Sequence, residues 1–340
     1  MNKTQLSKGV LIEQCSDRVF GKQNRQYLMG ISMIWIVLFH VWLWCEMSGI
    51  KTTRLIALFD KGALGVDLFL LLSAFGLQAS LERNTVGRFY VNRVKRLFPV
   101  YIFFLIILFL TFERDCPLER VLLQSLCQIT GFSLFKYPEF FSSGFCFDWF
   151  TPAIIFLYVL FPFISVVVKW LNKKGIIFEL IALVTCVVIG VWIRENKHFP
   201  FGLLALRLPI IFLGIITYLH LKNRTWYHLF LFIVIAACLG LLSGNEEMRI
   251  SLLLPPLLTS FSVTQFNIPF KKIISLVGRN SYEVYLAHIF PVAFIIPLKL
   301  TDSVLILTTI TIISTLFIAV LFSYLQRSFY LMWNKLYHLG

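Results

Sequence analysis

The sequence predicts an all-α, polytopic integral membrane protein, because three features of its 340 residues agree. First, 58% of the residues are hydrophobic, only 14% are charged, and the mean hydropathy is +0.81. Second, long runs such as 97–112, 176–193 and 229–244 carry almost no charge, and roughly 20 apolar residues cross a bilayer as a helix. Third, these runs lack the alternation of barrel strands, and only helices and closed barrels satisfy the backbone in lipid.

Taken in chain order, the apolar runs predict about ten transmembrane helices. They lie at residues 28–46, 62–81, 97–112, 149–168, 176–193, 200–219, 226–243, 250–266, 281–299 and 303–325. One further segment, 121–135, is apolar but short and is interrupted by polar residues. The chain leaves no room for a soluble domain, so we expect an N-terminal segment (1–27), a transmembrane domain (28–325) and a C-terminal tail (326–340).

The distribution of Lys and Arg decides the orientation of these helices. If 121–135 does not cross, most basic residues fall on the side of the N-terminus, which the positive-inside rule assigns to the cytoplasm. If it crosses, the basic stretches at 169–174 and 271–272 face outward. We therefore expect 121–135 to be a re-entrant or in-plane segment and both termini to be cytoplasmic. The same rule accounts for the net charge of +14, so nucleic acid is not an expected partner.

Apart from residues near the span ends, such as Glu179, five ionisable residues lie inside the predicted spans, where such residues are costly and are functional candidates. At about 1.5 Å per residue, His40, Asp67 and Arg207 fall at similar heights in the outer half, with His288 nearer the middle and Glu283 close to the cytoplasmic end. Asp67 could hold one ring nitrogen of His40 and leave the other to accept a proton. Alternatively, His40 is a hydrogen-bonded packing residue, Asp67 caps a helix, and Arg207 pairs with Asp67 structurally.

A basic stretch, GRFYVNRVKRLFPVY (87–101), precedes the third span. Arg93 and Arg96 share one face of a helix just inside the membrane, and Arg88 and Lys95 lie beside them. Basic residues at this position often only anchor a chain to anionic lipid. Arginine, however, is suited to bidentate binding of phosphate, so a phosphate-bearing donor is the alternative. The seven cysteines show no metal-ligand spacing, and no metal site is predicted.

Several stretches, each unspecific alone, occur in one order along residues 25–325. They are LMGISMIWIVLFH (28–40), GVDLFLLLSAFGLQAS (65–80), FYVNRVKRLFPVY (89–101), WFTPAIIFLYVLFP (149–162), LRLPIIFLGIITY (206–218) and NSYEVYLAHIFP (280–291). Together they resemble the acyltransferase-3 family, multi-pass membrane O-acyltransferases that modify bacterial surface glycans and related acceptors.

The resemblance implies a mechanism and a set of residues. His40 would be the general base or a transient acyl carrier, with Asp67 and Arg207 as our additional catalytic candidates. Arg93 and Arg96, with Arg88 and Lys95 beside them, would hold the phosphates of acyl-CoA, most often acetyl-CoA, a co-substrate rather than a permanently bound cofactor. The acceptor would be a surface glycan or lipid-linked saccharide at the bacterial cytoplasmic membrane, and a homodimer is one option for the assembly. The candidate substrate-side residues are Ser73, Trp149, Tyr158, Glu283 and His288.

The sequence departs from the family pattern at three positions. Met29 stands where the family commonly has an Arg, with Arg25 one turn earlier; Ile154 replaces a Glu, and Ala74 replaces a Gly. These departures keep two other functions open: a glycan or small-molecule transporter on the same scaffold, and a catalytically silent assembly protein. Retention of His40 and of the Arg-x-x-Arg pair favours the O-acyltransferase.

Overall fold

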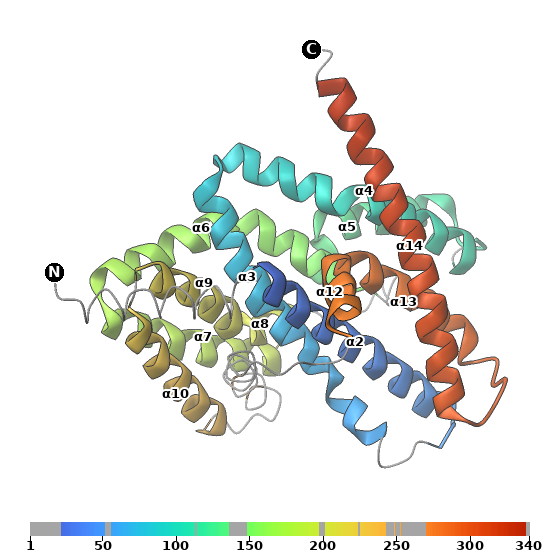
Figure 1. Ribbon diagram of the computed structural model, residues 1–340, viewed down its shortest axis with the longest axis horizontal. Helices are drawn as coiled ribbons and strands as arrows, with labels where there is room; N and C mark the ends of the chain where they lie inside the picture. The colour runs from blue at the N-terminus through green and yellow to red at the C-terminus, as the bar shows by residue number, and fades with distance from the viewer. Residues whose placement is uncertain are drawn as a thin grey trace.

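The computed structural model describes residues 22–51, 56–112, 114–135, 148–196, 201–223, 225–242, 248, 252 and 270–337. Helices account for nearly all of these residues (Figure 1). The elements, in chain order, are α2 (Lys22–Met47), η1 (Ile56–Leu64), α3 (Gly65–Arg83), α4 (Val86–Phe112), α5 (Leu118–Thr130), η2 (Phe132–Leu134), α6 (Phe150–Lys174), α7 (Ile176–Asn196), α8 (Phe201–Leu206), α9 (Leu208–Lys222), α10 (Trp226–Leu242), α12 (Lys271–Arg279), α13 (Ser281–Ile295) and α14 (Val304–Tyr337). The prediction of an all-α chain is thus confirmed for the part that the structure describes.

Seven candidate spans among the described residues are long and apolar enough to cross a membrane. They are Gln23–Met47, Phe59–Arg83, Val86–Phe112, Phe150–Lys174, Ile176–Asn196, Phe201–Lys222 and Val304–Lys335. The predicted spans 226–243 and 281–299 correspond to shorter apolar helices, Leu231–Leu242 and Ser281–Ile295. The predicted span 250–266 lies outside the described residues, apart from 252. The total of about ten spans therefore stays a prediction.

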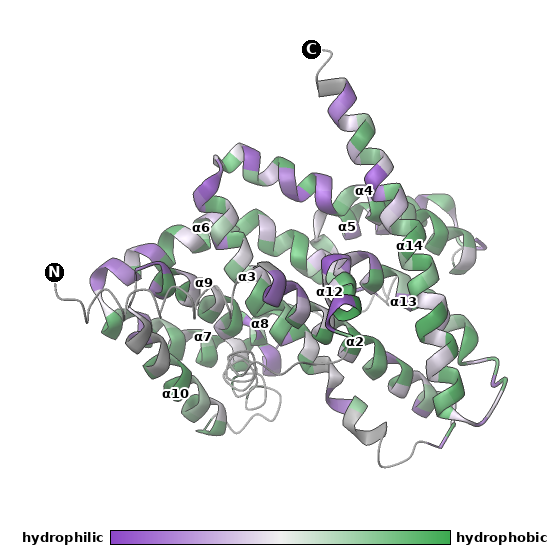
Figure 2. Cartoon of the chain, viewed as in Figure 1, coloured by the Kyte–Doolittle hydropathy of each residue, from purple (hydrophilic) through white to green (hydrophobic). Residues whose placement is uncertain are grey.

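The long helices are hydrophobic over most of their length (Figure 2), and many of their large apolar side chains are exposed. On α7, for example, Ile177, Ile181, Val184 and Val188 are all exposed and recur every three or four residues. A soluble protein rarely exposes a continuous apolar stripe of this kind. These surfaces fit a lipid environment and support the multi-pass membrane assignment.

Segment 121–135 lies in α5 and η2, and its two glutamines and Ser133 face inward. Leu122 and Leu126 are exposed, whereas Gln124 and Gln128 are buried. Tyr101 on α4 donates a hydrogen bond of 3.2 Å to Gln128 Oε1. With 13 residues, α5 is about 20 Å long, short of the roughly 30 Å of a hydrocarbon core. Its length agrees with a segment that does not cross, although its orientation stays a prediction.

Two predicted boundaries differ from the structure. The span predicted at 200–219 is two helices, α8 and α9, which meet at Arg207. The cause is Pro209, which has no N–H to donate and whose ring fits only the first turn of a helix. Conversely, the basic stretch 87–96 and the span 97–112 form one continuous helix, α4, which contains Pro99.

Helices α2 and α12 cross so closely that glycines are required at the contact. A Cβ on Gly278 would lie 1.7 Å from the backbone oxygen of Gln26, and a Cβ on Gly30 would lie 2.0 Å from that of Ile274. Small residues let two helix backbones approach within such distances. The crossing places the end of α12, and with it the start of α13, against the beginning of α2.

Candidate active site

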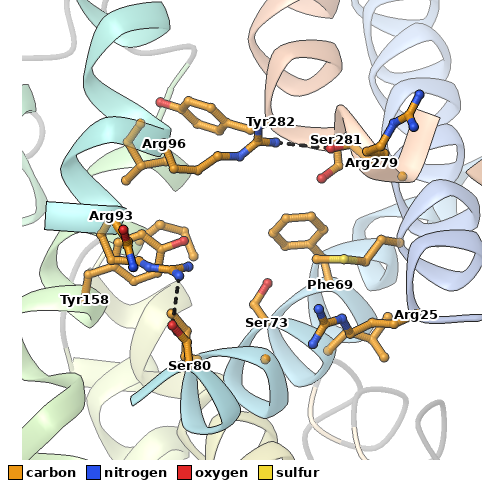
Figure 3. A pocket seen from close by; sticks show the side chains of 18 of the residues that line it. Arg25, Phe69, Ser73, Ser80, Arg93, Arg96, Tyr158, Arg279, Ser281 and Tyr282 are labelled. Atoms are coloured by element: carbon orange, nitrogen blue, oxygen red, sulfur yellow. Dashed lines mark hydrogen bonds between the residues drawn. The ribbon is translucent and has the colours of Figure 1, made fainter. Parts of the chain in front are cut away.

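A cavity of about 450 Å³ opens between α2, α3, α4, α6 and the α12–α13 junction (Figure 3). Five arginines line it, and none of the described residues that line it is an Asp or Glu; the arginines are Arg25, Arg83, Arg93, Arg96 and Arg279. We call it the arginine cavity. A cleft lined by charge of one sign concentrates its potential on ions of the other sign. The arrangement is suited to a ligand with several negative charges.

Arg93 is held by α3 and α6 with part of its hydrogen-bonding capacity unused. One of its terminal nitrogens donates to Ser80 Oγ at 3.2 Å (Figure 3). The guanidinium carbon lies 5.4 Å from the ring centre of Phe89 and 5.7 Å from that of Tyr158. Its Nε is buried and has no hydrogen-bond partner among the described residues. The stacked rings fix the plane of the guanidinium, and the remaining donors are left for a ligand.

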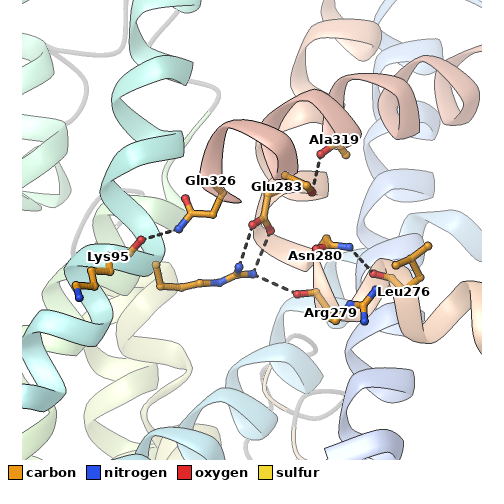
Figure 4. A network of polar contacts seen from close by, with 9 residues as sticks. Lys95, Leu276, Arg279, Asn280, Glu283, Ala319 and Gln326 are labelled. Carbon is orange, nitrogen blue, oxygen red and sulfur yellow. Dashed lines mark hydrogen bonds and ion pairs between the residues drawn. The ribbon is translucent and has the colours of Figure 1, made fainter. Parts of the chain in front are cut away.

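Arg96, by contrast, is engaged by a buried carboxylate (Figure 4). Its two terminal nitrogens donate to the two carboxylate oxygens of Glu283 at 2.9 and 3.0 Å, a bidentate ion pair. A further contact of 3.3 Å reaches the carbonyl oxygen of Arg279. Glu283 is 1% exposed, so Arg96 supplies the charge that a buried carboxylate requires. The pair also ties α4 to the first turn of α13.

The other predicted phosphate-binding residues do not line the arginine cavity. Arg88 is exposed at the start of α4. The ammonium of Lys95 lies 4.8 Å above the ring of Trp333 on α14, and its backbone oxygen accepts a hydrogen bond from Gln326 (Figure 4). Arg93 and Arg96 are therefore the two members of the predicted set that the cavity brings together.

The substrate-side candidates separate in the same way. Ser73 and Tyr158 line the arginine cavity, with Ser73 pointing into it from α3 (Figure 3). Trp149, directly before α6, does not line it; its ring lies 5.7 Å from the guanidinium carbon of Arg207. Glu283 and His288 both lie on α13, one beside the cavity and the other deeper in the bundle.

His40 and His288 form a hydrogen-bonded pair. His40 Nδ1 lies 2.9 Å from the carbonyl oxygen of Ile36 and 3.2 Å from His288 Nε2, and the ring centres are 4.8 Å apart. His288 Nδ1 in turn contacts the carbonyl oxygen of Tyr285. A carbonyl oxygen can only accept, so each Nδ1 is assigned the proton. The single Nδ1–H of His40 is then shared between the Ile36 carbonyl oxygen and His288 Nε2, and the Nε2 lone pair of His40 is left as the basic site.

Asp67 is paired with Arg207. The sequence analysis gave this structural pairing as an alternative to a contact between Asp67 and His40. Asp67 Oδ1 lies 2.9 Å from Arg207 Nε, and both side chains are almost completely buried. The atoms are close enough for an ion pair, but they are not aligned as a hydrogen bond. Arg207 also donates to the carbonyl oxygen of Leu203 at 2.9 Å. These contacts favour His288 over Asp67 as the residue that orients His40.

A buried acidic residue that the sequence analysis did not single out, Asp148, anchors α13. Its Oδ1 accepts a hydrogen bond from the Tyr285 hydroxyl at 3.1 Å and from the Thr151 backbone N–H at 2.9 Å. Burial raises the pKa of the Asp148 carboxyl, and the hydrogen bonds partly oppose that rise. Tyr285 is also the residue whose carbonyl holds His288, so Asp148 acts on the histidine pair through α13.

The model of the acyltransferase-3 family, described as an acyltransferase domain, matches residues 26–325, nearly the whole chain. The chain belongs to the acyltransferase-3 family. No curated protein matches it significantly, and neither does any solved structure. The matched domain includes His40, Arg93, Arg96 and His288.

Two of the three departures from the family pattern lie in the arginine cavity; the third, Ala74, does not line it. Met29 and Ile154 both line it. Arg25, one helical turn before Met29, lines it as well, and its guanidinium fills the space beside Gly76, where a Cβ would lie 2.7 Å from Arg25 Nη1. This acyltransferase-3 domain thus has an arginine on the same face of α2, four residues earlier than the family commonly places it.

Sequence reasoning missed Arg83 and Arg279 as cavity residues and Asp148 as an anchor. Arg83 and Arg279 each end a helix, where a basic residue is ordinarily explained by the helix dipole. Asp148 directly precedes Trp149, and an acidic residue at this position is ordinarily assigned to the membrane–water interface. Only the packing of α4, α6 and α13 around these side chains reveals their positions.

Proposed function

We propose that this chain is an O-acyltransferase that moves an acyl group, normally acetyl, from acyl-CoA in the cytoplasm to a hydroxyl group of a surface glycan or lipid-linked saccharide. One observation carries the proposal: a cavity lined by five arginines and the pair of His40 and His288 are joined by the same helices, α2 and α13. Membership of the acyltransferase-3 family supports it.

The arginine cavity supplies the donor site in this proposal. Arginine binds phosphate through charge-assisted, bidentate hydrogen bonds, and CoA carries several phosphate charges. Arg93 is the principal ligand because, unlike Arg96, it has no carboxylate partner among the described residues. Arg25, Arg83 and Arg279 add positive charge around it. Acyl-CoA enters as a co-substrate, and no permanently bound cofactor is required.

His40 performs the proton transfers. Its Nε2 takes the proton of the acceptor hydroxyl as that oxygen attacks the thioester carbonyl; a C–O bond forms and the C–S bond breaks. The same nitrogen then returns the proton to the departing thiolate, which leaves as free CoA. His288 Nε2 accepts a hydrogen bond from His40 Nδ1–H and stabilises the imidazolium, the role of the orienting residue in a catalytic triad. A transient acyl group on His40 would use the same lone pair.

Arg207 is our candidate for stabilising negative charge on the reacting carbonyl oxygen. A buried guanidinium held in a fixed direction stabilises developing negative charge more strongly than one in water. Asp67 holds Arg207 in that direction. Trp149, beside Arg207, is the candidate for stacking on a sugar. We place the protein in the bacterial cytoplasmic membrane, where both substrates meet at the bilayer; a homodimer is compatible with this function, and nucleic acid has no part in it.

The test measures transfer of labelled acetyl from acetyl-CoA to the glycan fraction, in membranes of cells that carry wild type, His40→Ala or Arg93→Ala. Loss of a general base lowers the rate by about 10²–10⁴-fold. Loss of Arg93 raises the KM for acetyl-CoA by about 10–100-fold, as expected for a hydrogen bond to a charged group. His228→Ala, on α10, is the matched control with unchanged transfer.

The outcomes separate the three functions. Equal glycan acylation in wild type, His40→Ala and Arg93→Ala would contradict the enzyme. Failure of glycan export while acylation stays intact would establish the transporter. Normal export and acylation in all variants, with loss of both only on deletion of the chain, would establish an assembly protein.

A further inference from the structure

A second, much smaller cavity lies directly against the arginine cavity. Its volume is about 10 Å³, and three of its lining residues, Phe69, Phe150 and Tyr282, also line the larger cavity. The others are Met33, Ile36, Val66 and Tyr285. We call these seven residues the apolar passage. Figure 3 shows the Phe69 ring at the arginine cavity, between Ser73 and the start of α13.

The lining residues of α2 advance step by step from the arginine cavity to the histidine pair. Arg25 and Met29 line the large cavity, Met33 and Ile36 line the small one, and His40 follows. The steps are three or four residues, so all five positions share one face of the helix. Ile36 and His40 are one turn apart on α2, and the backbone carbonyl oxygen of Ile36 lies 2.9 Å from His40 Nδ1.

Helix α13 repeats this order with aromatic residues. Tyr282 lines both cavities, Tyr285 lines the small one, and His288 follows at the same spacing. On α3 the same face carries Ser80, Ser73, Phe69 and Val66, which covers about 21 Å of helix. The small cavity thus lies between the site of the phosphates and the site of proton transfer.

The walls of the passage are packed. The ring centres of Phe69 and Phe150 are 5.6 Å apart in an edge-to-face contact, and those of Phe150 and Tyr285 are 5.0 Å apart. Met33 and Ile36 are buried on the opposite side. A cavity of about 10–15 Å³ holds one water molecule, which is close to the size of one methyl group. Close-packed walls do not yield to a larger group without displacement of side chains.

We propose that the apolar passage selects the acyl group by length and admits acetyl in preference to longer chains. This selection rests on the proposed acyl transfer and specifies which acyl-CoA donors that reaction accepts. The methyl end of acetyl fits the space, whereas each further methylene must displace Phe69 or its neighbours. One methylene in a hydrophobic pocket changes kcat/KM by about 10–200-fold, so propionyl-CoA is expected to be used at least ten times less efficiently than acetyl-CoA.

The experiment compares acetyl-, propionyl- and butyryl-CoA as donors for wild type, Phe69→Ala and Val66→Ala, in membranes that contain the cell's own acceptors. Labelled acyl transfer gives a propionyl-to-acetyl ratio for each protein, and a ratio is insensitive to how much of a variant folds. Both variants widen the passage and are expected to raise the ratio about tenfold or more. Phe322→Leu, a buried phenylalanine on α14 that packs against Phe103, is the matched control with an unchanged ratio.

The results distinguish selection of the acyl group by the passage from the acyl transfer on which that selection depends. Equal use of acetyl and butyryl donors by the wild type, or an unchanged ratio in both widened variants, would overturn selection by the passage and leave acyl transfer standing. No transfer from any of the three donors by the folded wild type would overturn the proposed function and this inference with it.

Discussion

At the scale of single residues, Arg93 and Arg96 show how one motif divides into two roles. The sequence places them three apart on one helix face and predicts the same task for both. In the structure, Arg96 neutralises the buried Glu283, while Arg93 is held by Ser80 and two aromatic rings and keeps a free donor. The difference comes from α13, which lies far away in the sequence and provides the carboxylate.

This division predicts unequal effects on stability. Arg96→Ala leaves a carboxylate buried without its cation, which costs about 3 kcal/mol, the lower end of the usual range because Arg96 is a third exposed. Arg93→Ala removes two cation–π contacts and one hydrogen bond and is expected to cost about 1–2 kcal/mol. Thermal unfolding of the purified proteins in detergent checks the order.

A double variant supplies the control for this explanation. Glu283→Gln removes the buried charge. Combining this substitution with Arg96→Ala is therefore expected to restore part of the lost stability. A double-mutant cycle measures this non-additivity. Strictly additive losses would contradict the charge-pair explanation.

At the scale of elements, the sequence predicted most of the long helices but not how they meet. Hydropathy over a window of about twenty residues is a local property, and α6, α7 and α14 begin close to their predicted positions. The break at Arg207 and the continuity of α4 through Pro99 were not predicted. Both involve a proline, Pro209 and Pro99, and a proline in an apolar run can either end a helix or be accommodated within it.

The α2–α12 crossing gives a prediction at this scale. Gly278→Ala would place a Cβ 1.7 Å from a backbone oxygen that cannot rotate away. Overpacking of this kind typically costs about 1–3 kcal/mol, and a contact this short belongs at the upper end. Gly87→Ala on α4 meets no atom within 4 Å and is expected to be neutral or to stabilise by up to about 1 kcal/mol. The melting temperatures of the two variants in detergent test the contrast; equal values would contradict the close crossing.

At the scale of the whole molecule, the arginine cavity gathers basic residues from several helices. The end of α3, the start of α4 and the end of α12 all contribute arginines to the cavity. The positive-inside rule predicts that these helix ends are cytoplasmic. The side on which the cavity opens therefore follows from charges spread over many loops rather than from any one residue.

Labelling of single cysteines tests this orientation. In a background without the native cysteines, Thr85→Cys lies between α3 and α4 and Lys51→Cys lies after α2, both at exposed positions. A membrane-impermeant maleimide added to spheroplasts is expected to label Lys51→Cys only, and to label Thr85→Cys after permeabilisation. The opposite pattern would reverse the predicted topology and place the arginine cavity outside the cell.

By itself, the sequence determined that the chain is helical, that it belongs in a membrane and that it resembles one family, because these properties depend on local hydropathy and on ordered motifs. It also identified His40, Arg93 and Arg96 as candidates. Only the tertiary structure decided the partners: His288 beside His40, Glu283 beside Arg96, Arg207 beside Asp67, and the apolar passage between the arginine cavity and the histidine pair. Pairing between helices distant in the chain depends on crossing geometry and side-chain packing, and a single sequence does not encode these as a local pattern.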